Sequence, residues 1–389
     1  MNHYHSLVID DSSALAPAAS WPDIEAAIEL ALTTAPAEPV AATEGEWFDY
    51  SVRMQRHLND HGLVGLEWPA EYGGRGLDPG AAARVMRRLS VAGVPELANY
   101  VGIDVLAPVL IELMDSVRLA RWLPAMAAAT EVWCQLFSEP EAGSDLASLR
   151  TRAEPDGDGW RVSGQKVWST WAHYATWGVL LARTGTTESR HRGITAFVVD
   201  MSTPGIEVRP LRTMTGAAHF AEVFLDDVRL PADAVIGEVG RGWAVTMQFL
   251  DHERGSYPAS RAGLLRRAYT QLRDRLPAGL APEAAARLGR IEVRLDALDA
   301  LASTLIGRLA AGEPLGPDAA VSKVLLSRTE QLLYNEIFAR SGDDGLFWAG
   351  ESVPRDIQEY LYSIAATIYG GARNIQLNII AERGLGLPR

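Results

Sequence analysis

The sequence predicts an α+β protein of three parts, with a helical domain over residues 1–130, a β domain over 131–240 and a helical bundle over 241–389. Apolar residues recur at helical spacing in the first part. Short segments rich in β-branched and aromatic residues alternate with turn residues in the second. The third part contains a long apolar stripe at alternating spacings of three and four residues, which is typical of a helix that packs against other helices.

Length and composition place the chain among ordinary globular proteins. It has 389 residues, of which 48% are hydrophobic and 22% charged, enough for about two to three domains. Lysines and arginines number 36 against 49 aspartates and glutamates, so a formal net charge of −13 leaves no positive field to attract nucleic acid. The charge-free run at residues 169–182 is polar and shorter than the about 18 residues that span a bilayer. We therefore expect neither nucleic-acid binding nor membrane insertion.

The opening residues and the cysteine content predict a cytoplasmic protein. The first basic residue is Arg53, and Asp10 and Asp11 interrupt the opening apolar residues, so neither a secretory signal nor an Arg-rich transit peptide is indicated. Cys134 is the single cysteine, which can form neither an internal disulfide nor a cysteine metal site. We expect Cys134 to be a small buried side chain in a strand, and we expect no metal centre.

The first part is predicted to be helical from Trp21, because Ile24 and Ile28 follow at helical spacing. Residues 62–80 contain too many glycines and prolines for a helix, so we expect an ordered loop inside this domain. Helices should resume at Ala81.

Seven short segments of the second part are predicted to be strands. They are rich in β-branched or aromatic residues and are bounded by Gly, Pro and Asp, which favour turns. The segments are residues 132–137, 148–153, 160–168, 177–183, 194–200, 206–210 and 221–230.

A long helix with one apolar stripe is predicted in the third part. The stripe consists of Leu288, Ile291, Leu295, Leu298, Ala302, Leu305 and Leu309. Partner helices must cover such a stripe, so we expect it to be buried. Residues 277–282 predict the turn before this helix, and residues 316–318 predict the start of another helix that reaches Arg340.

Several well-known catalytic motifs are absent from the sequence. It contains no G-x-G-x-x-G, G-x-x-x-x-G-K-[ST], H-E-x-x-H, C-x-x-C or G-x-S-x-G, so a Rossmann, P-loop, zincin or serine-hydrolase interpretation has little support. Two segments remain as candidate binding sites, namely residues 135–145 and 164–170.

These two segments have the chemistry of a site for a flat ring with a pyrophosphate. In the first, a strand runs into a tight Pro/Gly turn that exposes Ser144 and successive backbone N–H groups, which can hold a pyrophosphate. In the second, a strand places Trp168 and Thr170 on one face, so that an indole covers a heteroaromatic ring while a hydroxyl bonds a ring nitrogen. Glu139, Glu141 and Asp145 are interpreted as turn or solvated carboxylates.

Five segments in this order make the sequence similar to the acyl-CoA dehydrogenase family of flavoproteins, over nearly the whole chain. They are Trp68–Gly74, the S-E-P-x-A-G-S-D loop at 138–145, the G-x-K-x-W-S-T strand at 164–170, Glu222–Pro231 and Ile379–Arg389. The resemblance implies that family's fold, with an N-terminal helical domain, a middle β-barrel-like domain and a C-terminal four-helix bundle.

The resemblance also implies that FAD binds between the β domain and the bundle. The residues expected to contact it are Gln135, Leu136, Phe137, Ser138, Gly143, Ser144, Trp168, Ser169 and Thr170. Gln135 to Ser138 with Gly143 and Ser144 would line the flavin and pyrophosphate, and Trp168 to Thr170 would flank the isoalloxazine. Without that context, Trp168 would be interpreted as a core aromatic and the serines as turn residues.

The family's chemistry removes an α proton from an acyl thioester and passes the β hydrogen as hydride to flavin N5, so it requires a carboxylate beside the ring. Many members place a glutamate where this chain has Gly370. Members that resemble long-chain and isovaleryl dehydrogenases place it on a bundle helix, and the matching residue here is Glu253. We therefore predict Glu253 as the base, the alternative being a surface glutamate paired with an arginine. The Gly370 backbone N–H is predicted to bind the thioester carbonyl.

Asp251, Arg254 and Ser144 are the residues expected to bind substrate. The segment Arg273–Pro277 stands where many members carry R-x-x-F-G, which reaches the FAD of a neighbouring subunit. The resemblance implies an acyl group on CoA or on a carrier protein and an electron-transfer flavoprotein or similar acceptor. It also implies a homodimer, a homotetramer or a hetero-oligomer. Two alternatives stay open, a flavin oxidase or hydroxylase on the same fold and an FAD-poor structural subunit of a hetero-oligomer.

Overall fold

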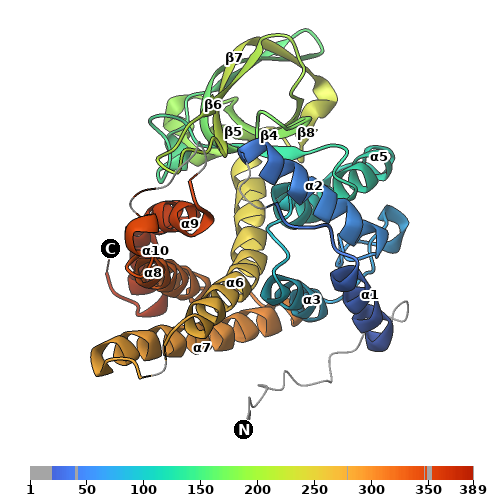
Figure 1. The fold of residues 1–389 in the computed structure, drawn as a ribbon. Coiled ribbons are helices and arrows are strands. Elements are labelled where there is room, and N and C mark those ends of the chain that lie inside the picture. Colours follow the sequence, from blue (N-terminus) through green and yellow to red (C-terminus); the bar gives the residue numbers. More distant parts are fainter. Residues whose placement is uncertain (1–19, 40–42, 278, 346, 348–352, 389) are drawn as a thin grey trace.

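A computed structural model describes residues 20–39, 43–277, 279–345, 347 and 353–388. Figure 1 shows a helical N-terminal part, a curled sheet and a helical C-terminal part, in the predicted order. Within the described residues, no helix combines the length and the apolar character needed to cross a membrane.

The described residues of the N-terminal part contain five α-helices. They are α1 (Trp21–Thr33), α2 (Glu44–Asp60), α3 (Pro79–Ala92), α4 (Ala107–Leu113) and α5 (Ser116–Ala127). Ile24 and Ile28 are fully buried, which confirms the helical spacing, and Thr43 with Glu46 forms a capping box that fixes the start of α2. The loop between α2 and α3 is ordered, as predicted, because Trp68 is 3% exposed and packs into the N-terminal core.

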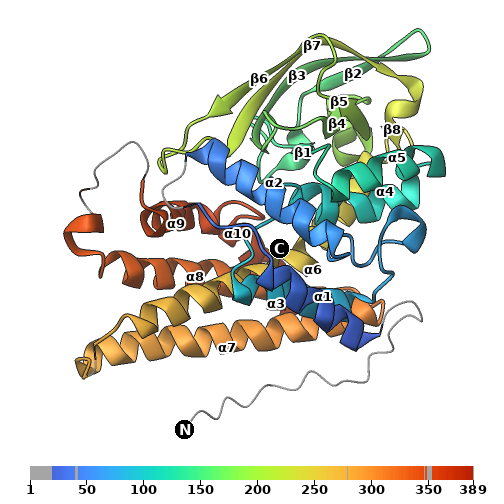
Figure 2. The ribbon, with the colours of Figure 1, turned by 45° about the vertical axis from the view of Figure 1, so that its right-hand side comes forward.

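The middle part is one eight-stranded sheet that curls around its own core (Figure 2). Its strands are β1 (Trp133–Leu136), β2 (Arg152–Asp156), β3 (Gly159–Thr170), β4 (Trp177–Arg183), β5 (Ile194–Asp200), β6 (Ile206–Leu211), β7 (Phe220–Pro231) and β8 (Val235–Ile236). The order is β6-β7-β3-β2-β4-β5-β8, with β1 beside β4. Only the pairs β1–β4 and β2–β4 are parallel among the described strands. Cys134 is fully buried in β1, as predicted.

The strand predicted over residues 148–153 is wrong over its first four residues. A 3₁₀ turn at Leu146–Ser148 precedes it, and β2 begins at Arg152. The physical reason is a side chain, because the backbone N–H groups of Arg150 and Thr151 donate to the carboxylate of Glu139 instead of to a neighbouring strand.

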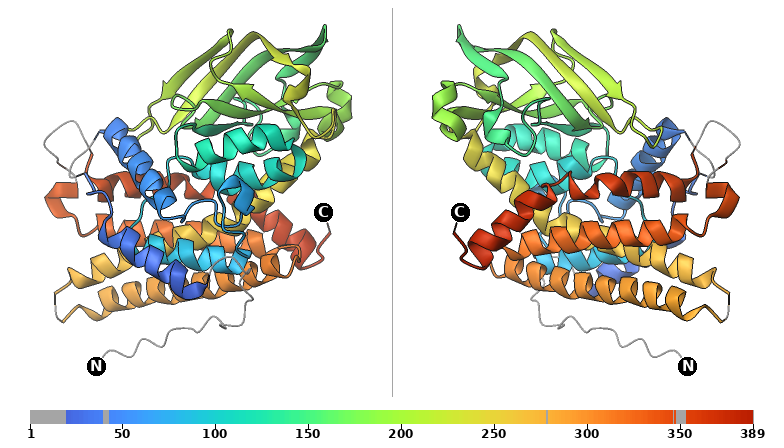
Figure 3. Two further views of the ribbon diagram at one scale, coloured as in Figure 1. Left: turned by 90° about the vertical axis from the view of Figure 1, so that its right-hand side faces the viewer. Right: turned by 90° about the vertical axis from the view of Figure 1, so that its left-hand side faces the viewer.

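Long helices dominate the C-terminal part, in which α7 and α8 lie side by side below the sheet (Figure 3). The helices are α6 (Gly242–Asp274), α7 (Pro282–Ala310), α8 (Asp318–Phe338), α9 (Arg355–Ser363) and α10 (Arg373–Ile379). The apolar stripe of α7 is buried from Leu288 to Leu305, as predicted, and Leu309 at its end is partly buried. The helix predicted to reach Arg340 ends as α8 at Phe338.

Helix α6 connects the sheet to the helical C-terminal part, since it begins under β5 and runs down into the bundle (Figure 1). Thr246 and Phe249 are fully buried in its first turns. The middle of α6 therefore lies where the sheet, the N-terminal helices and the bundle meet, and it is this stretch that carries Glu253.

Candidate active site

Glu253 and Gly370, which the sequence analysis predicts as the base and as the donor to the thioester carbonyl, lie next to each other. Glu253 is partly buried on α6, and Gly370 follows the 3₁₀ turn Ile364–Thr367. A Cβ atom at Gly370 would lie 3.4 Å from Oε1 of Glu253, and the φ of +59° favours glycine there. The structure thus brings one carboxylate and one glycine backbone to the same place.

The surroundings of Glu253 suit a proton acceptor. Burial raises the pKa of Glu253, while the charges of Lys323 and Arg254 act in the opposite direction. A carboxylate with a raised pKa binds a proton more strongly than a solvated one, which is what a base beside a weakly acidic C–H group requires. The neighbouring arginine on the helix, Arg254, pairs with Asp251 at 3.4 Å.

Asp251 and Arg254 stand apart from Glu253 on the same helix. The side chain of Asp251 is 69% exposed and that of Arg254 is 30% exposed. Asp251 is therefore exposed, whereas Arg254 is partly buried, as Glu253 is.

Lys323 on α8 is a charged neighbour that the sequence analysis missed. It is 8% exposed, and its Nζ would lie 3.4 Å from a Cβ at Gly370 and lies 4.3 Å from the ring centroid of Tyr369. Burial lowers the pKa of Lys323 to about 8, against the attraction of Glu330 and Glu253. A usable signal was present, because the chain contains just two lysines, Lys166 and Lys323, and both are buried.

On the sheet side, Trp168 is an exposed residue rather than a core aromatic. Its side chain is 59% exposed and meets the ring of Phe220 edge-on at 5.8 Å. Its φ is +60°, within a register shift of the β3–β7 pairing between Lys166 and Ser169. A left-handed backbone at a tryptophan costs of the order of 1–3 kcal/mol, and such strain concentrates at functional sites.

The other residues predicted to bind the cofactor differ in how far their side chains are exposed. Leu136, Phe137 and Ser169 are buried, so their side chains face the protein interior. Gln135 Nε2 and Ser169 Oγ are enclosed and lack a hydrogen-bond partner among the described groups. Such orphaned atoms are a feature that a bound ligand can satisfy.

The loop after β1 is held by a buried ion pair. Glu139 opens the turn to Ala142, as predicted, but the interpretation of its carboxylate as solvated is wrong. Glu139 is 8% exposed and bonds Nζ of the fully buried Lys166 at 2.8 Å. Although burial opposes ionisation, Lys166 and the surrounding donors keep the pKa of Glu139 below its usual value. Gly143 and Ser144 lie exposed beyond this anchor, at the tip of the loop.

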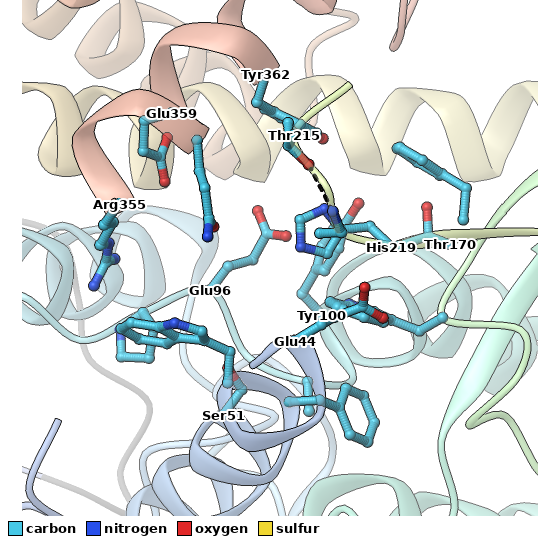
Figure 4. A pocket seen from close by; sticks show the side chains of 18 of the residues that line it. Glu44, Ser51, Glu96, Tyr100, Thr170, Thr215, His219, Arg355, Glu359 and Tyr362 are labelled. Atoms are coloured by element: carbon cyan, nitrogen blue, oxygen red, sulfur yellow. Dashed lines mark hydrogen bonds between the residues drawn. The ribbon is translucent and has the colours of Figure 1, made fainter. Parts of the chain in front are cut away.

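A cavity of about 750 Å³ lies between the sheet and helices α2, α6 and α9. Thr170 lines it from the sheet, and Tyr257, one turn after Glu253, lines it from α6. Polar and charged side chains from several elements point into it (Figure 4). The labelled ones are Glu44, Ser51, Glu96, Tyr100, Thr170, Thr215, His219, Arg355, Glu359 and Tyr362. The sequence analysis did not identify this cavity.

A helical, β and helical architecture with a glutamate at the junction of the three parts is that of flavoprotein oxidoreductases acting on CH–CH groups. The chain belongs to the acyl-CoA dehydrogenase family, since three models of that family match it. The N-terminal domain model matches residues 30–130, the middle domain model residues 134–228 and the C-terminal domain model residues 240–385.

Individual relatives agree with this assignment. Acyl-CoA dehydrogenase IpdE1 of Mycobacterium tuberculosis is 38% identical over 349 residues, which cover 89% of this chain and 90% of that protein. The solved Tcur3481-Tcur3483 steroid ACAD is 25% identical with a TM-score of 0.80, covering 94% of this chain and 93% of that chain. The ChsE4-ChsE5 complex from Mycobacterium tuberculosis is 26% identical with a TM-score of 0.79, covering 95% of this chain and 99% of that chain.

Proposed function

We propose that this protein binds FAD and oxidises the Cα–Cβ bond of an acyl-CoA, with Glu253 as the base. The observation that carries the proposal is the convergence of Glu253 with Gly370, since a Cβ at 370 would lie 3.4 Å from the Glu253 carboxylate. The carboxylate therefore occupies the region that the usual base would reach from position 370.

Each residue has a distinct part in this chemistry. Glu253 takes the α proton onto its carboxylate, and burial, which raises its pKa, helps it to hold that proton. The backbone N–H of Gly370 donates to the thioester oxygen and stabilises the negative charge that develops there. FAD, when bound, supplies the acceptor for the β hydrogen, which leaves as hydride.

The residues present fit a flavin. Trp168 offers an exposed indole beside Thr170, which lines the cavity. Gln135 Nε2 and Ser169 Oγ are enclosed polar atoms without a hydrogen-bond partner among the described residues, and a flavin could supply one. Gly143 and Ser144 present backbone N–H groups at an exposed loop tip, where a pyrophosphate can approach.

The cavity supports a bulky acyl group. Its volume of about 750 Å³ is within the range of sites that enclose a drug-sized ligand. The structural relative Tcur3481-Tcur3483 is described as a steroid ACAD, which points the same way. We propose a ring-bearing acyl group carried on CoA rather than on a carrier protein, because IpdE1 is named an acyl-CoA dehydrogenase.

Exposed apolar side chains support assembly with a second chain. They lie on α8, α10 and the segments beside them, and include Val321, Ile364, Ile368, Ile375, Leu385 and Leu387. Surfaces of this kind mark interaction sites. The relative ChsE4-ChsE5 is a complex of two chains, which favours a hetero-oligomer over a homodimer or homotetramer. We expect a cytoplasmic enzyme that passes its electrons to an electron-transfer flavoprotein or a similar acceptor.

The test is a flavin absorbance scan of the purified chain during anaerobic titration with saturated acyl-CoAs of graded size. Bleaching of the oxidised flavin band by a ring-bearing acyl-CoA is the expected result. Rapid recovery of the band in air without an added acceptor would instead favour the flavin oxidase or hydroxylase. A colourless chain that becomes yellow only with a partner subunit would favour the structural subunit.

Replacing Trp168 should weaken retention of FAD. In Trp168→Ala the exposed indole that would stack on the ring is lost, which removes roughly 1–3 kcal/mol of binding. The flavin-to-protein absorbance ratio after gel filtration should fall, while Trp160→Phe, a change inside the sheet, should leave it unaltered. Equal flavin content in Trp168→Ala and the wild type would contradict the assignment.

A further inference from the structure

Lys323 is a buried cation to which the proposed reaction gives no part. It lies in the first half of α8, and its Nζ is 4.3 Å from the centroid of the Tyr369 ring. Among the described residues, no carboxylate forms a direct ion pair with this ammonium. The other lysine of the chain, Lys166, bonds the carboxylate of Glu139 at 2.8 Å. A buried charge without a direct partner costs free energy, so the place of Lys323 needs an explanation.

Lys323 and the proposed base meet at Gly370. Oε1 of Glu253 and Nζ of Lys323 each lie 3.4 Å from the position that a Cβ atom at Gly370 would occupy. Glycine has no Cβ, so no side chain of residue 370 comes between the two charged groups. Burial opposes the ionisation of both, but the charge of Lys323 lowers the pKa of Glu253 and the charge of Glu253 raises the pKa of Lys323. The two groups therefore favour each other's ionised form.

The other titratable groups around Glu253 contribute less charge. Arg254, on the same helix, pairs with Asp251 at 3.4 Å and lies partly in solvent, which screens its charge. Burial raises the pKa of each phenol around Glu253 and Gly370, so these groups stay neutral at the pH of the reaction. The phenols are those of Tyr100, Tyr257 and Tyr369.

Lys323 keeps its charge over the pH range in which the carboxylate of Glu253 titrates. Burial lowers the pKa of Lys323 to about 8, against the attraction of Glu330 and Glu253. Glu330 is itself bonded to Arg261 at 2.5 Å, and the charge of Arg261 repels Lys323. With a pKa of about 8, the ammonium is protonated at neutral pH and below.

We propose that Lys323 is a positioning residue of the reaction, whose ammonium keeps the buried carboxylate of Glu253 ionised and able to accept the α proton. This inference rests on the proposed function, in which Glu253 is the base. The lack of a direct ion pair is part of the device, because a carboxylate bonded to an ammonium is a weaker base. Glu139 shows that case, since beside Lys166 its pKa is lowered although burial acts in the opposite direction, whereas the pKa of Glu253 is raised.

The first test compares the rate of flavin reduction at different pH in the wild type and in Lys323→Met, by stopped-flow absorbance. The variant lacks the charge that favours ionised Glu253, so the midpoint of the fall in rate at low pH should rise by about 1 to 2 pH units. Above a pH of about 8 the wild-type lysine is neutral as well, and the two rates should converge there. Lys323→Arg keeps the cation and should retain the wild-type midpoint.

Infrared difference spectra give a second readout that needs no turnover. The C=O stretch of a protonated carboxyl group that is missing from Glu253→Gln belongs to Glu253, and its titration follows the ionisation of this side chain. The midpoint of that titration should rise by the same amount in Lys323→Met and in Lys323→Gln. Because this measurement does not require Glu253 to be the base, it separates a failure of the inference from a failure of the proposed function.

The control variant is Ser327→Ala, a buried change one turn after Lys323 on α8 that alters no charge and should leave both midpoints unchanged. A titration of Glu253 that stays the same in Lys323→Met and in Lys323→Gln would overturn the proposal. An equal loss of rate at every pH would also overturn it, because that is the result expected if Lys323 serves only the packing of α8.

Discussion

Replacing Glu253 by glutamine should slow flavin reduction by about 10²- to 10⁴-fold while FAD and acyl-CoA still bind. Glutamine keeps the shape and hydrogen bonding of the side chain but cannot accept the α proton. Because reduction needs both loss of the α proton and transfer of the β hydrogen, the variant should form a complex and leave its flavin oxidised. Stopped-flow absorbance measures the reduction rate, and calorimetry measures binding of the same acyl-CoA.

The pH dependence of the wild type gives an independent check. The base acts in its ionised form, and burial raises the pKa of Glu253 above the ordinary value of 4.5. The rate should therefore fall, as pH is lowered, around a midpoint above 4.5, and this acid limb should be missing from the residual activity of Glu253→Gln. Asp274→Asn, an exposed change at the end of α6, should keep both rate and profile. Near-normal bleaching by Glu253→Gln would eliminate this residue as the base.

A second substitution can place a carboxylate in the same region from position 370 instead of position 253. Gly370→Glu in the Glu253→Gln background should recover part of the lost rate, since a Cβ at 370 lies 3.4 Å from the position of Glu253 Oε1. Recovery should be incomplete, because a side chain at a φ of +59° costs roughly 1–2 kcal/mol and Lys323 Nζ is equally close. The reduction rate of the double variant, compared with that of Glu253→Gln, measures the recovery.

The order of helical, β and helical parts could be predicted because it depends on local patterns. The buried stripe of α7 follows from spacing alone, and so do Ile24 and Ile28 in α1. The prediction for residues 148–153 failed because a side chain distant in sequence, Glu139, binds backbone that a strand would have used. Periodicity carries no information about such a contact.

The candidate site also depends on contacts between residues distant in sequence, which periodicity does not predict. Glu253 and Gly370 were identified through a resemblance, and their proximity depends on how α6 packs against the turn before α10. Glu96 and Glu359 line one cavity although more than half of the chain separates them in sequence. No spacing rule links residues so far apart, so the cavity and its charge balance required the packed structure.

Replacing Lys166 by methionine should destabilise the protein by about 3–5 kcal/mol, because it leaves the carboxylate of Glu139 buried without its cation. Glu139 also holds the N–H groups of Arg150 and Thr151, and Lys166 donates to the carbonyl of Phe137 at 3.2 Å. Loss of the pair should therefore loosen both ends of the loop that carries Gly143 and Ser144. Lower unfolding midpoints in urea and lower flavin content are the expected measurements.

The double variant Glu139→Gln with Lys166→Met tests whether the loss of stability comes from an uncompensated buried charge or from lost packing. It removes the carboxylate that the single variant leaves uncompensated, so it should unfold at a higher urea concentration than Lys166→Met alone. Arg150→Ala, which removes an exposed side chain but keeps the backbone N–H that Glu139 binds, serves as the matched control and should stay near the wild type. If the double variant were less stable than either single variant, the pair would be acting through packing, and charge compensation would not explain why this loop is anchored by a lysine.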